Sequence, residues 1–236
     1  MLGLQEQIGE STVASALARH GYLFLKAWQP EVSIFELACS IGAVVDVEKI
    51  AGSYRIGNVQ TLKPRESDVS SPHSYSAVYG FNDFPLHTDY AHWGTPSRFL
   101  MLRCRTGDPS VSTYLLPSSC IADHASHIID RAIVAPRRKH PAQAICPLAV
   151  RYRKAGQVGF RWDSLFLRPL NQAAEALAEV VKARARIDRI AVALSDPGDT
   201  LIIDNWNMLH GRSEVPQQGL GRHIERIYLS TLWELK

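Results

Sequence analysis

Two histidines and one aspartate in this chain have the spacing of a metal site. Residues 84–90 read Phe-Pro-Leu-His-Thr-Asp-Tyr, which places His87 and Asp89 two positions apart. In a strand, side chains at i and i+2 point to the same face, so the imidazole and the carboxylate would converge on one point. A second histidine, His210, follows a turn and an apolar run at 198–204. We take these three residues as candidate metal ligands.

Three protein ligands would leave three coordination positions of the metal open. Non-haem Fe(II) oxygenases use two histidines and one carboxylate in this way to admit a cosubstrate and O2. A structural zinc site would instead be closed by four protein ligands. The His-x-Asp pattern alone is a weak indication, because so short a pattern arises by chance and a strand histidine is more often a core or surface residue.

Two arginines near the C-terminus strengthen the metal hypothesis. Arg222 and Arg226 follow His210, and Arg226 opens the apolar run 227–232, where a charged side chain is costly unless it is paired. The carboxylate of an anionic cosubstrate would supply a bidentate partner. The alternative is that Arg226 pairs with a nearby acid such as Glu225 or Glu234. Together with the three ligands, we favour the cosubstrate.

Many short strands and a few helices must position these residues. Strand patterns lie at 22–28, 54–62, 84–90, 99–104, 112–116, 144–152, 158–162, 189–194, 200–204 and 225–233, and helix patterns at 11–20, 30–39, 121–131 and 172–185. This mixture predicts a mainly β fold, a jelly-roll-like double sheet with flanking helices. We find no repeat and no linker, so we expect one domain over 1–236, with a helical insert at about 120–188 and a possible lid at 64–82. A disordered surface loop is the alternative for the lid.

Composition limits the classes of protein and partner. Apolar residues make up 46% of the 236 residues, and the net charge is only +3 with scattered Lys and Arg, which argues against a nucleic-acid partner. No apolar run is long enough to span a membrane, and the N-terminus does not resemble a signal peptide. The four cysteines form no Cys-x-x-Cys pair, so we expect a cytoplasmic protein with Cys104 and Cys146 as small core residues.

The sequence resembles the taurine dioxygenase/clavaminate synthase-like branch of the Fe(II)/2-oxoglutarate-dependent oxygenases. The resemblance rests on Phe-Pro-Leu-His-Thr-Asp at 84–89, on the block at 198–212 that runs from Gly-Asp-Thr-Leu-Ile-Ile-Asp-Asn to Leu-His-Gly-Arg, and on Arg222 and Arg226. It extends from about residue 21 to the C-terminus and is thin before Phe84. The resemblance implies a double-stranded β-helix (jelly roll, cupin-like). It also implies Fe(II) held by His87, Asp89 and His210, with 2-oxoglutarate and O2 as cosubstrates.

The resemblance also implies the 2-oxoglutarate site. Thr113 would help to bind this cosubstrate, although residues 109–113 read Pro-Ser-Val-Ser-Thr where the family usually has Gly-Gly-Asp-Thr. Arg226 is the better match for the salt bridge to the distal carboxylate, and Arg222 would lie closer to the end that chelates iron. Related halogenases replace the carboxylate ligand with a small residue, so Asp89 disfavours halogenation.

The implied reaction oxidises an unactivated C–H bond of a small polar molecule, such as an amino acid or a natural-product intermediate, with release of succinate and CO2. Hydroxylation is the default outcome, and desaturation, ring closure and epimerisation are alternatives. Candidate substrate residues, each of which could equally be structural, are Tyr79, Tyr90, His92, Trp93, Arg161, Asp163, Asn205 and Arg212. Arg212 could instead lock the loop of His210. A metal hydrolase or cupin isomerase, and a non-catalytic jelly-roll metal-binding protein, remain rivals. The oligomeric state is not predicted.

Overall fold

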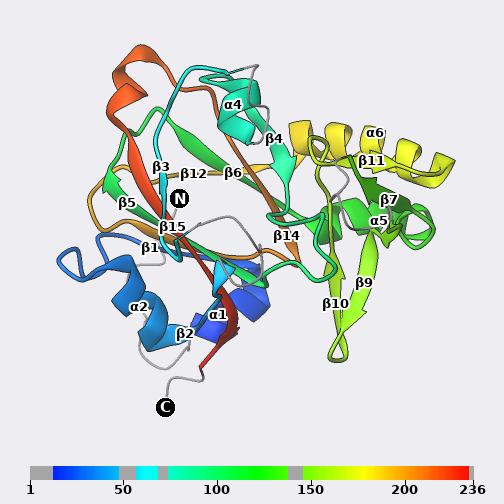
Figure 1. Cartoon of the computed structure of the whole chain (residues 1–236), viewed down its shortest axis with the longest axis horizontal. Coiled ribbons are helices and arrows are strands. Elements are labelled where there is room, and N and C mark those ends of the chain that lie inside the picture. The colour runs from blue at the N-terminus through cyan, green and yellow to red at the C-terminus, as the bar shows by residue number, and fades with distance from the viewer. Residues whose placement is uncertain (1–12, 48–56, 69–73, 138–145, 234–236) are drawn as a thin grey trace.

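The computed structural model describes residues 13–47, 57–68, 74–137 and 146–233. Its larger antiparallel sheet has the strand order β1-β13-β5-β15-β2, and β3 also pairs with β15. Figure 1 shows this sheet crossing the body of the molecule, with β5 in the middle of its strand order. The strands are β1 (Tyr22–Leu25), β13 (Thr200–Asp204), β5 (Phe99–Thr106), β15 (His223–Leu232), β2 (Gly42–Val44) and β3 (Gln60–Leu62).

A smaller antiparallel sheet packs on the larger one and carries most of the candidate site. Its strand order is β12-β6-β14-β4. The strands are β12 (Ile190–Ala193), β6 (Ser112–Pro117), β14 (Met208–Arg212) and β4 (Phe84–His87). Two facing antiparallel sheets confirm the predicted mainly β, jelly-roll fold class.

The larger sheet is buried on both faces, which explains its continuous apolar runs. In β5, Leu100 and Leu102 pack in the core cluster shared with the smaller sheet. Met101 points to the opposite face, because side chains alternate along a strand, and packs in the cluster formed with α1 (Val13–His20) and α2 (Ile34–Ile41). The two helices therefore cover the outer face of the sheet.

Between β6 and β12 the chain forms an insert to one side of the two sheets (Figure 1). Its sheet order is β11-β7-β8, and β9 and β10 form a hairpin whose turn residues Ala155 and Gly156 have φ values of 48° and 78°. Two adjacent positive φ angles are typical of a type I′ turn. The elements are α5 (Ser118–Ile129), β7 (Ile133–Pro136), β8 (Leu148–Ala149), β9 (Arg151–Lys154), β10 (Gln157–Phe160), β11 (Leu167–Pro169) and α6 (Gln172–Ile187).

Two predicted elements near the N-terminus are wrong in extent. The strand predicted at 22–28 ends at Leu25, since Ala27 and Gln29 adopt positive φ angles of 44° and 42° and turn the chain. The helix predicted from residue 30 begins at Ile34 instead. Ser33 and Glu36 form a capping box there, in which each side chain accepts a hydrogen bond from the other residue's backbone amide.

Other elements differ more modestly. The strand predicted at 144–152 divides into β8 and β9, and β14 was not predicted as a strand. Of the pattern at 54–62, the described residues 57–62 are a strand only over β3. Residues 11–12, 54–56, 69–73 and 144–145, which belong to predicted elements, lie outside the described residues. Within 64–82 the structure contains a short helix, α4 (Tyr75–Tyr79).

The cysteines are all free, but they differ in environment. Cys104 is buried, as predicted, whereas Cys146 is exposed. The prediction for Cys146 is wrong because the residue lies in the irregular segment before β8, outside the core. Across the described ranges, none of the helices combines the length and the apolar character needed to cross a membrane.

Candidate metal centre

The three predicted ligands come together between β4 and β14. His87 is the last residue of β4 and lies opposite His210 of β14 in the antiparallel register. His87 Nε2 lies 3.6 Å from Asp89 Oδ1, and His210 Nε2 lies 3.5 Å from Asp89 Oδ2. One ligand atom from each residue lies within 4.8 Å of the other two. The backbone thus places two imidazoles and a carboxylate around one point.

Asp89 reaches this point by a different local geometry from the one expected. The strand ends at His87, and Asp89 lies in the turn that follows, so the argument from strand alternation is wrong at this residue. The buried amide of Asn205 holds the turn instead. Its oxygen accepts a hydrogen bond from Asp89 N (2.7 Å), and its nitrogen donates to Asp89 O (3.0 Å). Tyr90 then turns the chain with a φ of 55°.

The two histidines present their Nε2 atoms to the site. His87 Nδ1 lies 2.8 Å from the carbonyl oxygen of Pro85, which can only accept a hydrogen bond. The proton therefore resides on Nδ1, and Nε2 keeps a free lone pair. A backbone carbonyl commonly orients metal-bound histidines in this way.

The surroundings of Asp89 and His210, but not those of His87, favour the protonation state that a metal ligand requires. Burial alone would raise the pKa of Asp89, but the Arg226 guanidinium and the two histidines hold it well below its usual value. Burial lowers the pKa of His210. For His87, burial also acts to lower the pKa, but the carboxylates of Asp89 and Asp163 and the Pro85 carbonyl together raise it. Asp89 is therefore ionised and His210 neutral at pH 7, as metal ligands must be.

The donor set fits an open divalent iron site. Among the described residues, the group contains two histidines and one aspartate, with no fourth histidine, cysteine or acidic residue. A structural zinc site would need that fourth ligand. Two imidazoles and one carboxylate suit Fe(II), with the remaining positions left for exogenous ligands.

Arg226 lies beside the candidate ligands, where it contacts Asp89. Its NH1 is 3.1 Å from Asp89 Oδ2, and its Nε and NH2 donate to Gln60 Oε1 at 3.1 and 2.6 Å. The acid predicted as an alternative partner, Glu225, lies near Arg105 instead, and Glu234 is outside the described residues. Arg226 is thus the arginine in direct contact with a candidate ligand.

Arg222 is a buried cation that forms no ion pair within the described residues, although the Asp108 carboxylate is near enough to act to raise its pKa. It follows the 3-10 helix η1 (Gln217–Gly221), is 7% exposed, and forms no ion pair or hydrogen bond within the described ranges. Burial lowers its pKa to about 10. Its charge also acts, after burial, to lower the pKa of Arg212, so the two arginines are close. Thr113, which is buried, lies opposite Arg212 in the register of β6 and β14.

Three of the predicted substrate residues are occupied by backbone contacts. Arg161 donates to the carbonyl oxygens of residues 91, 93 and 94, and its guanidinium lies 4.5 Å from the Tyr152 ring. Arg212 donates to the carbonyl oxygens of Gly80 and Asn82 at 2.9 and 2.7 Å. The Asn205 side-chain nitrogen donates to the Ser97 carbonyl (2.8 Å) as well as to Asp89 O, so both of its N–H groups are engaged. These contacts favour the structural alternative for all three.

The other predicted substrate residues remain beside the metal centre. Asp163 Oδ1 accepts hydrogen bonds from the Tyr75 hydroxyl (2.8 Å) and from two backbone amides of the turn that follows it. The predicted aromatic residues form two stacked pairs with their neighbours, and His92 makes edge contacts with Tyr90 and Trp93. In the stacked pairs, Tyr90 lies on Trp93 and Tyr79 lies on Tyr75.

Gln60 and Tyr228 were not predicted as site residues. Gln60 binds Arg226 and also donates to the Tyr90 hydroxyl at 3.2 Å, and the Tyr228 hydroxyl donates to Asp89 Oδ2 at 2.8 Å. Tyr228 could have been found, because it lies two positions after Arg226 in the same strand and so shares its face. Nothing in the local sequence distinguishes Gln60.

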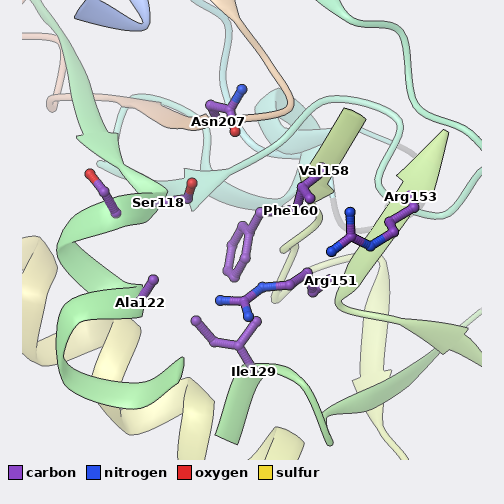
Figure 2. A pocket seen from close by; sticks show the side chains of 10 residues that line it. Ser118, Ala122, Ile129, Arg151, Arg153, Val158, Phe160 and Asn207 are labelled. Atoms are coloured by element: carbon purple, nitrogen blue, oxygen red, sulfur yellow. The ribbon is translucent and has the colours of Figure 1, made fainter. Parts of the chain in front are cut away.

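A separate hollow of about 280 Å³ lies in the insert, between the start of α5 and the hairpin of β9 and β10 (Figure 2). Figure 2 shows Ser118 and Asn207 on one side of it and the guanidinium groups of Arg151 and Arg153 on the other. None of its lining residues belongs to the metal centre, and Arg151 already pairs with Asp130. The hollow therefore adds nothing to the metal site.

Comparisons with known proteins establish the fold. No family model and no curated protein matches the sequence. Among solved structures, PvcB, "an Fe, alpha-ketoglutarate dependent oxygenase from an isonitrile synthetic pathway", matches with a TM-score of 0.65 at 16% identity, over 92% of this chain and 78% of that one.

Two further structures contain products of related chemistry. OrfP, in complex with Fe, succinate and (3S)-hydroxy-L-Arg, matches with a TM-score of 0.59 at 18% identity, over 92% of this chain and 77% of that one. Asparagine oxygenase, in complex with Fe(II), 2S,3S-3-hydroxyasparagine and succinate, has the same score and identity over 74% of this chain. The matched region spans only 57% of that chain. At these identities the likeness shows that the chain has the fold of the Fe/alpha-ketoglutarate-dependent oxygenases.

Proposed function

We propose that this protein is an Fe(II)- and 2-oxoglutarate-dependent oxygenase. The observation that carries the proposal is the pairing of an open His87–Asp89–His210 site with a buried arginine, Arg222, that forms no ion pair among the described residues. A buried unpaired cation is costly, and the distal carboxylate of 2-oxoglutarate would remove that cost. Neither a metal hydrolase nor a cupin isomerase needs such an anion site.

The cosubstrate assignment follows from where the two arginines lie. Arg222 and Thr113 both lie near Arg212, the last residue of β14. We propose that they would bind the distal carboxylate. Arg226 lies on Asp89 and would face the chelating end, where its remaining N–H donors can reach a carboxylate. Bound iron would supply the activation of O2, coupled to conversion of 2-oxoglutarate to succinate and CO2.

The substrate we propose is a small polar molecule such as an amino acid or a natural-product intermediate. Asparagine oxygenase and OrfP were solved with hydroxylated amino acids, which supports an amino-acid-like substrate and hydroxylation as the outcome. Asp163, Tyr90, His92 and Trp93 remain as candidate contacts, because Asp163 binds Tyr75, which stacks on His87, and the other three follow Asp89 closely in the chain and contact one another. Desaturation, ring closure and epimerisation would use the same residues.

Succinate release tests the proposal. Anaerobically Fe(II)-loaded protein should bind 2-oxoglutarate and, once O2 and a panel of amino acids are added, release succinate in a substrate-stimulated manner. Asp89→Ala should abolish release and weaken metal binding, whereas Asp123→Ala, at an exposed position of α5, should behave as wild type. Metal binding without 2-oxoglutarate binding would instead support a non-catalytic metal-binding jelly roll or another metalloenzyme.

A further inference from the structure

The two oxygens of the Asp89 carboxylate have unequal surroundings. Oδ2 accepts a hydrogen bond from the Tyr228 hydroxyl at 2.8 Å and another from Arg226 NH1 at 3.1 Å. Oδ1 faces His87 Nε2 at 3.6 Å and accepts no hydrogen bond within the part of the chain that the structure describes. Each carboxylate oxygen has about two lone-pair sites. The two hydrogen bonds therefore occupy the lone-pair sites of Oδ2, which also lies 3.5 Å from His210 Nε2, whereas Oδ1 accepts no hydrogen bond within the described residues.

Tyr228 is held with its hydroxyl beside Asp89 and Tyr90. Its side chain is fully buried in β15, and its ring packs on Tyr90 with centroids 4.8 Å apart. Arg226, two residues earlier, points to the same face of the strand, whereas Ile227 between them packs on the helical side of the sheet. Because side chains alternate along β15, Arg226 and Tyr228 lie on the same face and both donate to Asp89 Oδ2.

From this asymmetry we propose that Tyr228 is a positioning residue which, with Arg226, restricts Asp89 to metal ligation through Oδ1 alone. The inference rests on the proposed function, since it assumes that the triad holds the iron. A carboxylate that ligates through both oxygens occupies two coordination positions. It would take one of the three positions that a two-atom chelating cosubstrate and O2 require. Tyr228 thereby keeps the third position open without touching the metal.

Cobalt(II) binding tests the role of Tyr228 without any turnover. Tyr228→Phe removes one donor to Oδ2 and keeps the ring. Tyr152→Phe is the matched control, because the Tyr152 hydroxyl is also buried but has no hydrogen-bond partner among the described residues. We expect Co(II) affinity, measured by titration calorimetry, to fall about tenfold in Tyr228→Phe, as on loss of other residues that orient a ligand. The visible ligand-field spectrum should change with it, and Tyr152→Phe should match wild type in both.

A merely structural role for Tyr228 would lower the melting temperature and leave the Co(II) spectrum unchanged, which would overturn the proposal. The wild-type protein provides a second test that needs no variant. A crystal structure with Co(II) should show Asp89 bound through Oδ1 only, and ligation through both oxygens would also overturn it. If wild type binds no Co(II) at the triad, the proposed function itself fails and this inference falls with it.

Discussion

The phenol ring of Tyr75 lies flat on the imidazole of His87, with centroids 4.0 Å apart and planes 18° apart. Tyr75 is the first residue of α4, and its hydroxyl donates to Asp163 in the insert. Figure 1 shows α4 beside β4, the strand that ends at His87. One residue of the predicted lid segment therefore covers a face of a metal ligand and ties α4 to the chain after β10.

Replacing Tyr75 with Phe should loosen α4. The variant keeps the stacked ring but loses a hydrogen bond to a carboxylate, which contributes about 1.5 kcal/mol. We expect about tenfold faster hydrogen exchange at the α4 amides of Val78 and Gly80, measured by mass spectrometry. Tyr22→Phe, on the distant strand β1, is the control. Unchanged exchange in α4 would show that the Asp163 contact does not hold the helix.

Replacing Arg222 with Met should stabilise the ligand-free protein and remove its response to 2-oxoglutarate. Met keeps the length of the side chain but removes a buried charge that forms no ion pair in the described ranges. We expect the free energy of unfolding of the metal-free protein to rise by about 1 kcal/mol. Stabilisation by added 2-oxoglutarate, present in metal-loaded wild type, should disappear.

The control for Arg222→Met is Arg105→Met, at a half-exposed arginine of β5. Thermal unfolding with and without 2-oxoglutarate compares the two variants. If Arg222→Met loses stability yet keeps its response to 2-oxoglutarate, Arg222 is a structural residue and the distal carboxylate binds elsewhere.

Replacing Asn205 with Ala should cost stability and metal affinity together. The buried amide makes three hydrogen bonds to the backbone of Asp89 and Ser97, and its loss leaves buried groups unsatisfied. We expect a loss of about 3 kcal/mol in the free energy of unfolding, measured by urea denaturation. Weaker Co(II) binding should accompany it, because the turn that carries Asp89 loses its anchor. A substrate residue would instead alter only the Michaelis constant for the substrate, with stability unchanged.

The cysteines should differ sharply in reactivity. Burial raises the pKa of Cys104 to about 11, so only about a thousandth of it is thiolate at pH 8. Cys39 and Cys146 are exposed. Brief treatment of the native protein with iodoacetamide should alkylate these two and spare Cys104, as measured by peptide mass spectrometry. In urea Cys104 should react as fast as the others, and its fast alkylation in the native protein would show that the sheet opens around it.

The sequence was most informative where one residue type carries the chemistry. His87, Asp89 and His210 could be named because few side chains bind iron, and their convergence in the structure confirms the geometry required of them. The jelly-roll class could be predicted because short apolar runs separated by turn residues have few stable arrangements. Strand ends were less predictable, as at Leu25, because an unusual φ angle at Ala27 has no residue signature.

What the sequence by itself provided is therefore a candidate ligand set, the fold class and the presence of two arginines after His210. Only the tertiary structure decided what each polar side chain contacts. It placed Arg226 on Asp89, left Arg222 without an ion pair among the described residues, and used the amide of Asn205 to hold a turn. The reason is that these contacts join residues more than a hundred positions apart. Which of these residues meet depends on the strand register in the two sheets, and no local sequence pattern encodes that register.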